Sequence, residues 1–227
     1  MTVASSMTVV AIDGPAGVGK STVARRVAAR LGVPYLDTGS MYRAVAWKAL
    51  KEGLDPADGP AMARLIAGLH FELRPRNAEA EVVLDGEVPG ARLRTPRVDV
   101  ATSRVAVHPA VRSWLVAKQR EFAAREGAVV EGRDIGTVVF PETPHKFYLE
   151  APLEVRAERR LRQLGGRESG DRGRLLTEMR DRDERDIRRR ASPLRRDDTY
   201  QLIDTSTGDA EQVADRILRS VRAGPGP

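Results

Sequence analysis

Hydrophobic and polar positions follow two different periods along this chain. Residues 8–12 form a short, β-branched apolar run that ends at Asp13-Gly14-Pro15, which predicts a buried strand followed by a turn. From Lys20 to Leu31 the apolar residues recur four positions apart, and Gly32 follows. This pattern predicts a helix with one apolar face that ends at the glycine.

The remaining periodic segments predict strands that alternate with helices. Strands are expected at 35–36, 128–130, 146–149 and 200–203, and helices at 38–50, 60–69, 98–126 with a new start at Pro109, 153–190 with breaks at Gly165-Gly166 and Gly170, and about 213–221. Residues 71–74 and 81–84 alternate and precede Asp85-Gly86, a hairpin turn signal, so a small β-rich insertion is expected. The order predicts an α/β fold with a parallel central sheet covered on both faces.

Composition narrows the class of protein. The chain has 227 residues, which fits one domain or one core with insertions, and it has no cysteine and only 3 His. A disulfide framework, a thiolate metal site and a cysteine nucleophile are therefore excluded. The longest apolar runs span only a few residues, so no membrane association is expected. The missing cysteines are consistent with a cytoplasmic protein.

Positive charge is concentrated in one segment. Of the 38 basic residues 33 are Arg, and the net charge of the whole chain is +6. Residues 154–196 hold 15 Arg and 9 acidic residues, so this segment alone accounts for the +6. Such an excess fits either nucleic acid or a small anion gripped by arginine forks. With only 4% aromatic residues, base stacking along a nucleic acid is disfavoured, so a small phosphorylated ligand is preferred and no nucleic acid is expected.

One complete motif predicts nucleotide chemistry. Gly14-Pro15-Ala16-Gly17-Val18-Gly19-Lys20-Ser21 matches the phosphate-binding loop pattern, and it lies between a predicted strand and a predicted helix. The glycines let backbone N–H groups converge on phosphate oxygens, and the helix N-terminus adds positive charge. Lys20 is expected to bridge the outer phosphates of ATP, and Ser21 to hold Mg²⁺ through them.

The motif leaves the reaction open, and other features limit it. A GTPase normally reads guanine with Asn-Lys-x-Asp, but the single Asn, Asn77, is followed by Ala. A short chain with a phosphate-binding loop and many arginines fits phosphoryl transfer to a small acceptor. Such a transfer between phosphates needs charge neutralisation rather than a general base, in keeping with the absence of His near the motif.

Four blocks carry a family resemblance. Residues 13–21 (DGPAGVGKS), 36–43 (LDTGSMYR), 131–137 (EGRDIGT) and 185–189 (RDIRR) closely resemble bacterial cytidylate kinase. The resemblance implies an adenylate-kinase-like protein with a core at about 1–37, 105–155 and 197–227, a monophosphate-binding part at about 38–104 that contains the β-rich insertion, and a lid at about 156–196. It further implies a monomer that transfers phosphate from ATP to CMP or dCMP.

Site residues are carried over by position. ATP would be bound by Gly14, Pro15, Ala16, Gly17, Val18, Gly19, Lys20, Ser21 and Thr22. CMP would be bound by Asp37, Thr38, Arg43, Ser103, Arg112, Arg133, Asp134, Asp186 and Arg189. The groups that act on the moving phosphoryl would be Lys20, Arg133, Arg189 and the lid arginines Arg156, Arg160 and Arg182.

Base choice has a chemical interpretation. Cytosine presents an amino donor at N4, which Asp134 could accept, and acceptors at N3 and O2, which Arg112 or Arg133 could reach. Uracil carries an oxygen in place of the amino group and would be disfavoured by a carboxylate there. Kinases with UMP or AMP as acceptor, and a basic nucleic-acid-binding ATPase, are the alternatives. Tyr42 could lie under the acceptor nucleotide or fill the core.

Overall fold

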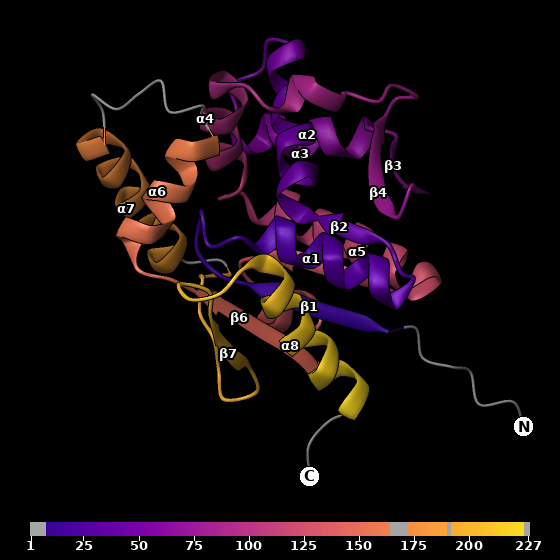
Figure 1. Cartoon of the computed structure of the whole chain (residues 1–227). Helices are drawn as coiled ribbons and strands as arrows, with labels where there is room; N and C mark the ends of the chain where they lie inside the picture. Colours follow the sequence, from indigo (N-terminus) through magenta and orange to yellow (C-terminus); the bar gives the residue numbers. More distant parts are fainter. Residues whose placement is uncertain (1–7, 164–171, 190–191, 225–227) are drawn as a thin grey trace, which may run out of the picture. The chain divides into compact units, whose positions relative to one another are not determined.

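The structure is a computed structural model, and it describes residues 8–163, 172–189 and 192–224 (Figure 1). These residues fall into two compact units, one formed by residues 8 and 32–128 and the other by 9–31 and 129–224, apart from the gaps. Seven strands and the helices between them give the α/β class predicted from the sequence. Within the described ranges, no helix has the length and apolar character needed to cross a membrane.

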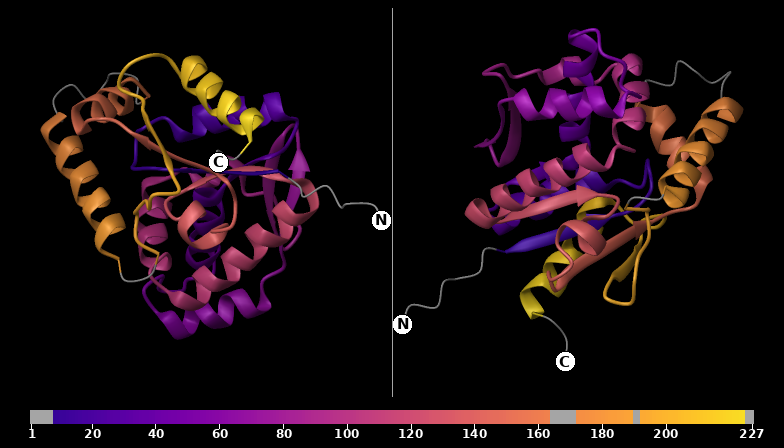
Figure 2. Two further views of the ribbon diagram at one scale, coloured as in Figure 1. Left: turned by 90° about the horizontal axis from the view of Figure 1, so that it is seen from below. Right: turned by 180° about the vertical axis from the view of Figure 1, so that it is seen from behind.

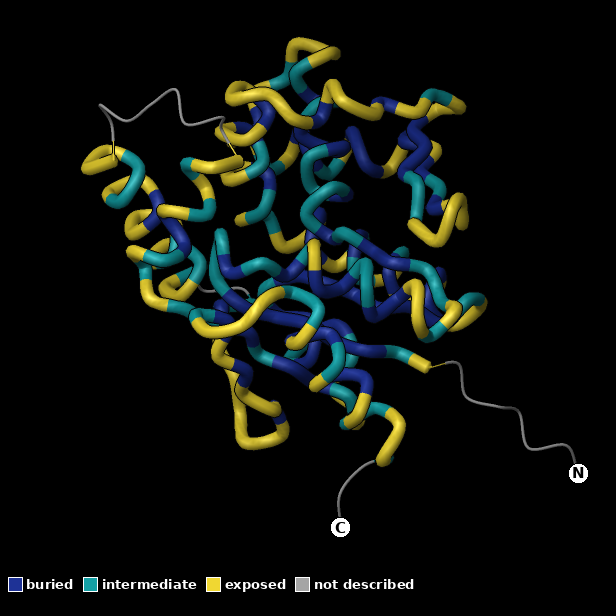
Figure 3. The backbone as a smooth tube through the Cα atoms, in the orientation of Figure 1, coloured by how far each residue is buried: buried dark blue, intermediate teal, exposed yellow. Residues whose placement is uncertain are grey.

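The second unit is built on four neighbouring strands in the order β5-β1-β6-β7, which are Ala128–Gly132, Val9–Asp13, His145–Glu150 and Gln201–Asp204. β1 pairs with β6 and β6 with β7, both in parallel. The inner strands are buried (Figure 3). Val10, Ala11 and Ile12 of β1 are completely inaccessible, whereas β7 at the edge is exposed except at Ile203. A continuous apolar run is typical of a parallel strand covered on both faces, so the prediction of a parallel core is confirmed here.

Helices α1 (Lys20–Leu31) and α8 (Ala210–Ala223) lie side by side in this unit (Figures 1 and 2). An ion pair between Arg26 Nε and Glu211 Oε2 at 3.2 Å joins them, and Arg30 pairs with both Glu211 and Asp215. Asp209 begins α8 with a capping box, which satisfies the first backbone N–H groups of the helix.

The arginine-rich segment forms two helices of the same unit, α6 (Leu153–Gln163) and α7 (Arg172–Arg188), which pack against each other. α7 is largely exposed, and among its described residues Met179 is the one that is buried. Several arginines pair with acids of their own helix, as Arg162 does with Glu158 and Arg174 with Glu178, so they belong to a solvated helix face. The predicted glycine breaks at 165, 166 and 170 lie outside the described residues.

The first unit contains the strands β2 (Tyr35–Asp37), β4 (Glu79–Leu84) and β3 (Phe71–Arg76). β2 pairs with β4 in parallel, and β4 with β3 in antiparallel fashion. The helices are α2 (Thr38–Lys51), α3 (Gly59–Gly68), α4 (Pro96–Val105) and α5 (Pro109–Glu126), with a 3₁₀ turn at Gly90–Leu93. The β-rich part thus ends near Asp85-Gly86, and the rest of the expected insertion is helical.

Two tight turns shape the β3–β4 region. Asn77 and Ala78 have φ values of 50° and 61° and form the hairpin turn, which the sequence analysis did not anticipate. An alanine in this left-handed region costs about 1 kcal/mol, so the pairing of β3 with β4 on either side must hold it there. Asp85 and Gly86 form the second turn, closed by two backbone hydrogen bonds of 2.8 Å between Leu84 and Glu87.

Candidate active site

The phosphate-binding loop connects β1 to α1 in the second unit, as predicted. Other atoms approach two of its glycines closely. A Cβ on Gly14 would lie 2.3 Å from the carbonyl oxygen of Leu149, and one on Gly17 would lie 3.1 Å from the carbonyl oxygen of Arg156 and 2.9 Å from Cε of Met179. Both glycines also have positive φ, which other residues rarely adopt. The loop is therefore tightly packed between β6 and the helix α7.

Lys20 is the first residue of α1 and is buried, with 8% of its surface exposed. Its Nζ donates a hydrogen bond of 2.7 Å to the carbonyl oxygen of Pro15, so the side chain curls back over the loop. Burial, followed by the nearby charge of Arg133, lowers the pKa of Lys20 to about 7, and Glu131 offsets only part of this. A polyphosphate bound in the loop would favour the charged ammonium again.

Ser21 and Glu131 meet beside the loop, although 110 positions separate them. The Ser21 hydroxyl donates to Oε1 of Glu131 at 2.7 Å, and Glu131 lies buried on β5. Hydroxyl and carboxylate oxygens are hard donors of the kind that Mg²⁺ prefers. Ser21 and Glu131 therefore fit a Mg²⁺ that also binds nucleotide phosphates. Among the described residues no group of three or more His, Cys, Asp or Glu forms a metal cage.

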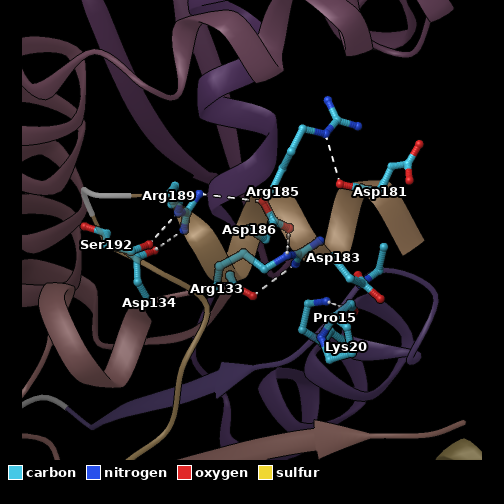
Figure 4. Close-up of polar contacts among 12 residues, drawn as sticks. Pro15, Lys20, Arg133, Asp134, Asp181, Asp183, Arg185, Asp186, Arg189 and Ser192 are labelled. Carbon is cyan, nitrogen blue, oxygen red and sulfur yellow. Dashed lines mark hydrogen bonds and ion pairs between the residues drawn. The ribbon is translucent and has the colours of Figure 1, made fainter. Parts of the chain in front are cut away.

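A cluster of four charged residues unites two of the sequence blocks (Figure 4). Arg133 Nε donates to Asp186 Oδ2 at 2.8 Å. Arg189 lies between two carboxylates, with Nη2 at 3.8 Å from Asp134 Oδ1 and Nη1 at 3.9 Å from Asp186 Oδ1. All four side chains are at most 20% exposed. Burial alone would raise the pKa of Asp186, but Arg133 and Arg189 outweigh it and hold that pKa below its usual range.

Arg156 connects α6 to the phosphate-binding loop. Its Nη1 donates to the carbonyl oxygen of Ala16 at 3.0 Å and to Asp183 Oδ2 at 2.6 Å, while Nε donates to the carbonyl of Ala151 at 3.0 Å. The backbone N–H of Ala16 donates in turn to Asp183 Oδ1 at 3.4 Å. Asp183 was missed in the sequence analysis, although it lies one helical turn from both Met179 and Asp186 on α7.

The other two predicted lid arginines are placed differently. Arg160 is exposed and donates to Gln163 of its own helix at 3.4 Å. Arg182 is exposed and lies close enough to lower the pKa of Lys20, though less than burial and Arg133 do. Arg159, which the sequence analysis did not select, donates to Thr205 Oγ1 at 3.0 Å and to the carbonyl of Val18 at 3.4 Å.

Three predicted acceptor-side residues gather at the start of α2 in the first unit. Asp37 caps the helix, since its Oδ1 accepts from the Ser40 N–H at 3.0 Å. Its Oδ2 accepts from Arg43 Nη2 at 2.7 Å, so the cap also orients the guanidinium. Thr38 is the first residue of α2 and is buried, with 5% of its surface exposed.

The two residues predicted to read the base belong to different helices of the first unit. Ser103 is exposed on α4, and its hydroxyl donates to the carbonyl of Asp99 at 3.5 Å. Arg112 is buried on α5, where Nη1 donates to the carbonyl of Ala106 at 3.3 Å and the guanidinium lies 5.5 Å from the centre of the Tyr42 ring. Tyr42 therefore supports Arg112.

The loop, its lysine and the arginines around it define a P-loop kinase. The chain belongs to the cytidylate kinase family, since the family model described as cytidylate kinase matches residues 10–223. A cytidylate kinase of Nitratidesulfovibrio vulgaris (strain Hildenborough) is 43% identical over 223 residues, which cover 98% of this chain and 96% of that protein. A cytidylate kinase of Rhodococcus opacus (strain B4) is 45% identical over 226 residues, covering 98% and 99%.

One solved structure supports the fold. It is an uncharacterized protein from Eubacterium ventriosum, with a TM-score of 0.50 and 15% identity, and the match covers 95% of this chain and 99% of that one. The family resemblance and the α/β fold class inferred from the sequence are thus both confirmed.

Proposed function

We propose that this protein transfers the γ-phosphoryl group of ATP to CMP or dCMP and releases ADP with CDP or dCDP. The observation that carries the proposal is the cluster of Arg133, Asp134, Asp186 and Arg189 in the same unit as the phosphate-binding loop. Its members come from two sequence blocks about 50 positions apart, and both blocks are among those that resemble cytidylate kinases. The names of the curated relatives agree with this reaction.

The chemistry requires few special groups. An oxygen of the acceptor phosphate attacks the γ-phosphorus of ATP, the bond from that phosphorus to the β–γ bridging oxygen breaks, and ADP leaves with the electron pair. The attacking oxygen is already anionic, so no general base is needed. Lys20, Arg133, Arg156 and Arg189 supply positive charge for the transferring group, and Arg160 and Arg182 are proposed to join them from the lid.

Mg²⁺ is the proposed cofactor, with Ser21 and Glu131 as the residues that would hold it beside the nucleotide phosphates. When bound, the ion neutralises charge on the phosphates and on the transferring group. Gly14 to Thr22 are proposed to bind ATP. The chain's own part is to keep the Ser21 hydroxyl and the Glu131 carboxylate together, which their hydrogen bond already does.

The acceptor is proposed to be bound by Asp37, Thr38 and Arg43 through its phosphate side. Ser103, Arg112, Arg133 and Asp134 would read the cytosine ring, and Asp186 with Arg189 would reach the sugar. Asp134 is the group that would separate cytosine from uracil, because only cytosine offers an amino donor at N4. We further propose that the chain divides into a core, a monophosphate-binding part and a lid, and that it acts as a monomer. Its proposed location is the cytoplasm, and its proposed role is in pyrimidine nucleotide metabolism.

A panel of acceptors tests the proposal. ADP release is followed by a coupled assay, with CMP, dCMP, UMP and AMP offered in parallel to the purified full chain. We expect CMP and dCMP to be used at least about tenfold more efficiently than UMP. The reason is that the Asp134 carboxylate would gain a hydrogen bond from cytosine, whereas uracil would leave it without one. Equal rates for CMP and UMP would refute the base-selection argument. A preference for AMP would replace the proposed acceptor by another nucleoside monophosphate.

A further inference from the structure

Asp13 is a buried carboxylate that the proposed reaction does not use. It is the last residue of β1, directly before Gly14, and its surface is completely inaccessible. Oδ1 accepts from the backbone N–H of Ile135 at 3.0 Å, and Oδ2 accepts from that of Gly136 at 2.9 Å. The Tyr200 hydroxyl donates to the same Oδ2 at 2.7 Å. Three donors separated by more than 120 positions from Asp13 thus converge on one side chain.

The two backbone donors place this contact next to the charged cluster. Ile135 and Gly136 directly follow Arg133 and Asp134 in the chain, and they open a five-residue π-helical turn, Ile135–Val139. π-helical turns are rare and are frequent at functional sites. Asp134 itself has an irregular backbone, with φ −145° and ψ 24°. The direction of the Arg133 and Asp134 side chains therefore depends on where the first N–H groups of this turn are held.

Tyr200 closes the arrangement at Gly136. A Cβ on Gly136 would lie 2.7 Å from the Tyr200 hydroxyl oxygen and 2.9 Å from its Cζ, so only glycine fits there. The Tyr200 ring also packs edge-on against Tyr148 of β6, with 6.2 Å between the ring centres. The contact leaves the turn little freedom, because the tyrosine fills the space beside Gly136 and the carboxylate holds the N–H groups of Ile135 and Gly136.

A carboxylate suits this position better than any neutral side chain. Ionised aspartate only accepts hydrogen bonds, and its two oxygens can serve all three donors at once. An asparagine offers one oxygen and would turn an NH₂ group toward at least one N–H. Burying the charge is unfavourable, and burial is the main reason why the pKa of Asp13 is raised to about 6. The hydrogen bonds from Gly136, Ile135 and Tyr200 lower the pKa and offset part of this rise.

We propose that Asp13 is a positioning residue, which holds the turn at Ile135 and Gly136 so that Arg133 and Asp134 are correctly placed for phosphoryl transfer. Asp13 acts through Arg133 and Asp134 and touches no reacting atom. The inference rests on the proposed function, because it assigns Arg133 and Asp134 to the acceptor and the moving phosphoryl group.

Asp13→Asn tests the inference, with kcat and KM for CMP measured separately. We expect kcat/KM to fall by about 10- to 100-fold, because small displacements of a positioned group cost this much. The same substitution is then made in the Arg133→Ala background, where the displaced arginine is already gone and only the effect through Asp134 remains. There we expect a smaller loss, below about tenfold, since neighbours in one network are not additive. An equal loss in both backgrounds would overturn the inference and leave Asp13 a purely structural residue.

Two further variants keep the test decisive. Tyr200→Phe removes one of the three donors and leaves the two backbone bonds, so it serves if Asp13→Asn does not fold. It should lower kcat/KM by about threefold, the value of one hydrogen bond, and again less in the Arg133→Ala background. Asp209→Ala removes the cap of α8 far from the turn and is the matched stability control, expected to lower the melting temperature without changing kcat/KM.

The outcomes separate this inference from the proposed function. If the wild-type chain does not phosphorylate CMP, the proposed function fails. The effect of Asp13→Asn in the wild-type and Arg133→Ala backgrounds is then measured with the acceptor that the panel identifies. If the wild-type chain is active and Asp13→Asn and Tyr200→Phe both match it, the inference alone fails.

Discussion

The phosphate side of the candidate site (the loop with Arg133, Asp134, Asp186 and Arg189, in the second unit) and the base side (Ser103 and Arg112, in the first unit) are built in different ways. Asp134 belongs to the phosphate side by its ion pair and is proposed to contact the base as well. In the second unit Arg133, Asp134, Asp186 and Arg189 are paired with one another by ion pairs of 2.8–3.9 Å. In the first unit Ser103 and Arg112 each donate to a backbone carbonyl nearby in sequence, those of Asp99 and Ala106. The pair Asp37 and Arg43, also in the first unit, resembles the phosphate side.

The difference follows from what each side has to bind. A polyphosphate concentrates charge, so the protein must hold several buried arginines, and carboxylates keep those arginines in place before the ligand arrives. A base offers neutral donors and acceptors, so an uncharged group such as the Ser103 hydroxyl can take part in reading it. The phosphate side should therefore tolerate substitution much less than the base side.

The largest expected effect is on Lys20. Lys20→Ala removes the only lysine of the phosphate-binding loop, and we expect ADP release to fall by about 10³-fold, in the range of other lost transition-state contacts. The matched control is Lys51→Ala, which breaks an exposed pair with Glu87 and should stay within twofold (about 0.4 kcal/mol) of the wild type. Activity above about one tenth of the wild type in Lys20→Ala would contradict the assignment.

Arg156 should follow. Arg156→Ala removes the guanidinium that contacts both Ala16 and Asp183, and kcat should fall by about 100-fold. Arg162→Ala is the control on the same helix, since Arg162 is exposed and pairs only with Glu158 among the described contacts. If the two variants have equal kcat, α6 contributes no specific group and the phosphate side is less organised than its ion pairs imply.

The buried charge of Asp13 should appear in the pH dependence of stability. Its pKa is raised to about 6 in the folded protein, so the folded state binds more protons than the unfolded one between pH 4 and 6. The stability of the wild type relative to Asp13→Asn should then fall by about 2 kcal/mol as the pH rises from 4 to 7. Urea unfolding at several pH values measures it, with the exposed Asp99→Asn as control. A difference that does not change with pH would show that the charge is not buried at a cost.

A smaller effect is expected for base choice. Asp134→Ala should lower the ratio of kcat/KM for CMP over UMP by about tenfold, because the lost contact is a single hydrogen bond to a charged group. The exposed Glu142→Ala should leave the ratio unchanged. If Asp134→Ala keeps the preference for CMP, base reading must be assigned to Ser103 and Arg112. The residues of the base side would then matter more for base choice than Asp134 on the phosphate side.

Local patterns in the sequence predicted most of the fold. The strand, loop and helix around Gly14 to Ser21 follow from a run of apolar residues, a glycine pattern and a helical period, all of which are neighbours in sequence. The same holds for α8 and for β6. The turn at Asn77-Ala78 was missed, because alanine carries no turn signal and the strands on either side determine its backbone.

The site was predicted less completely, for a different reason. Family resemblance located Arg133, Asp134, Asp186 and Arg189, but the partners that organise the phosphate side lie far away in sequence. Ser21 meets Glu131, Arg156 meets Asp183, and Asp13 meets Tyr200. Such pairings follow from how strands and helices pack, and neither periodicity nor a short motif encodes them.

The central claim is that the phosphoryl group passes from ATP to the acceptor on the organised phosphate side. ATP labelled in its γ-phosphate is incubated with CMP, Mg²⁺ and the full chain, and the label is then located among the products. The account predicts label in the β-phosphate of CDP, with little in inorganic phosphate, and loss of both in Lys20→Ala. Label that appears only in inorganic phosphate would contradict it, because the protein would then transfer the group to water.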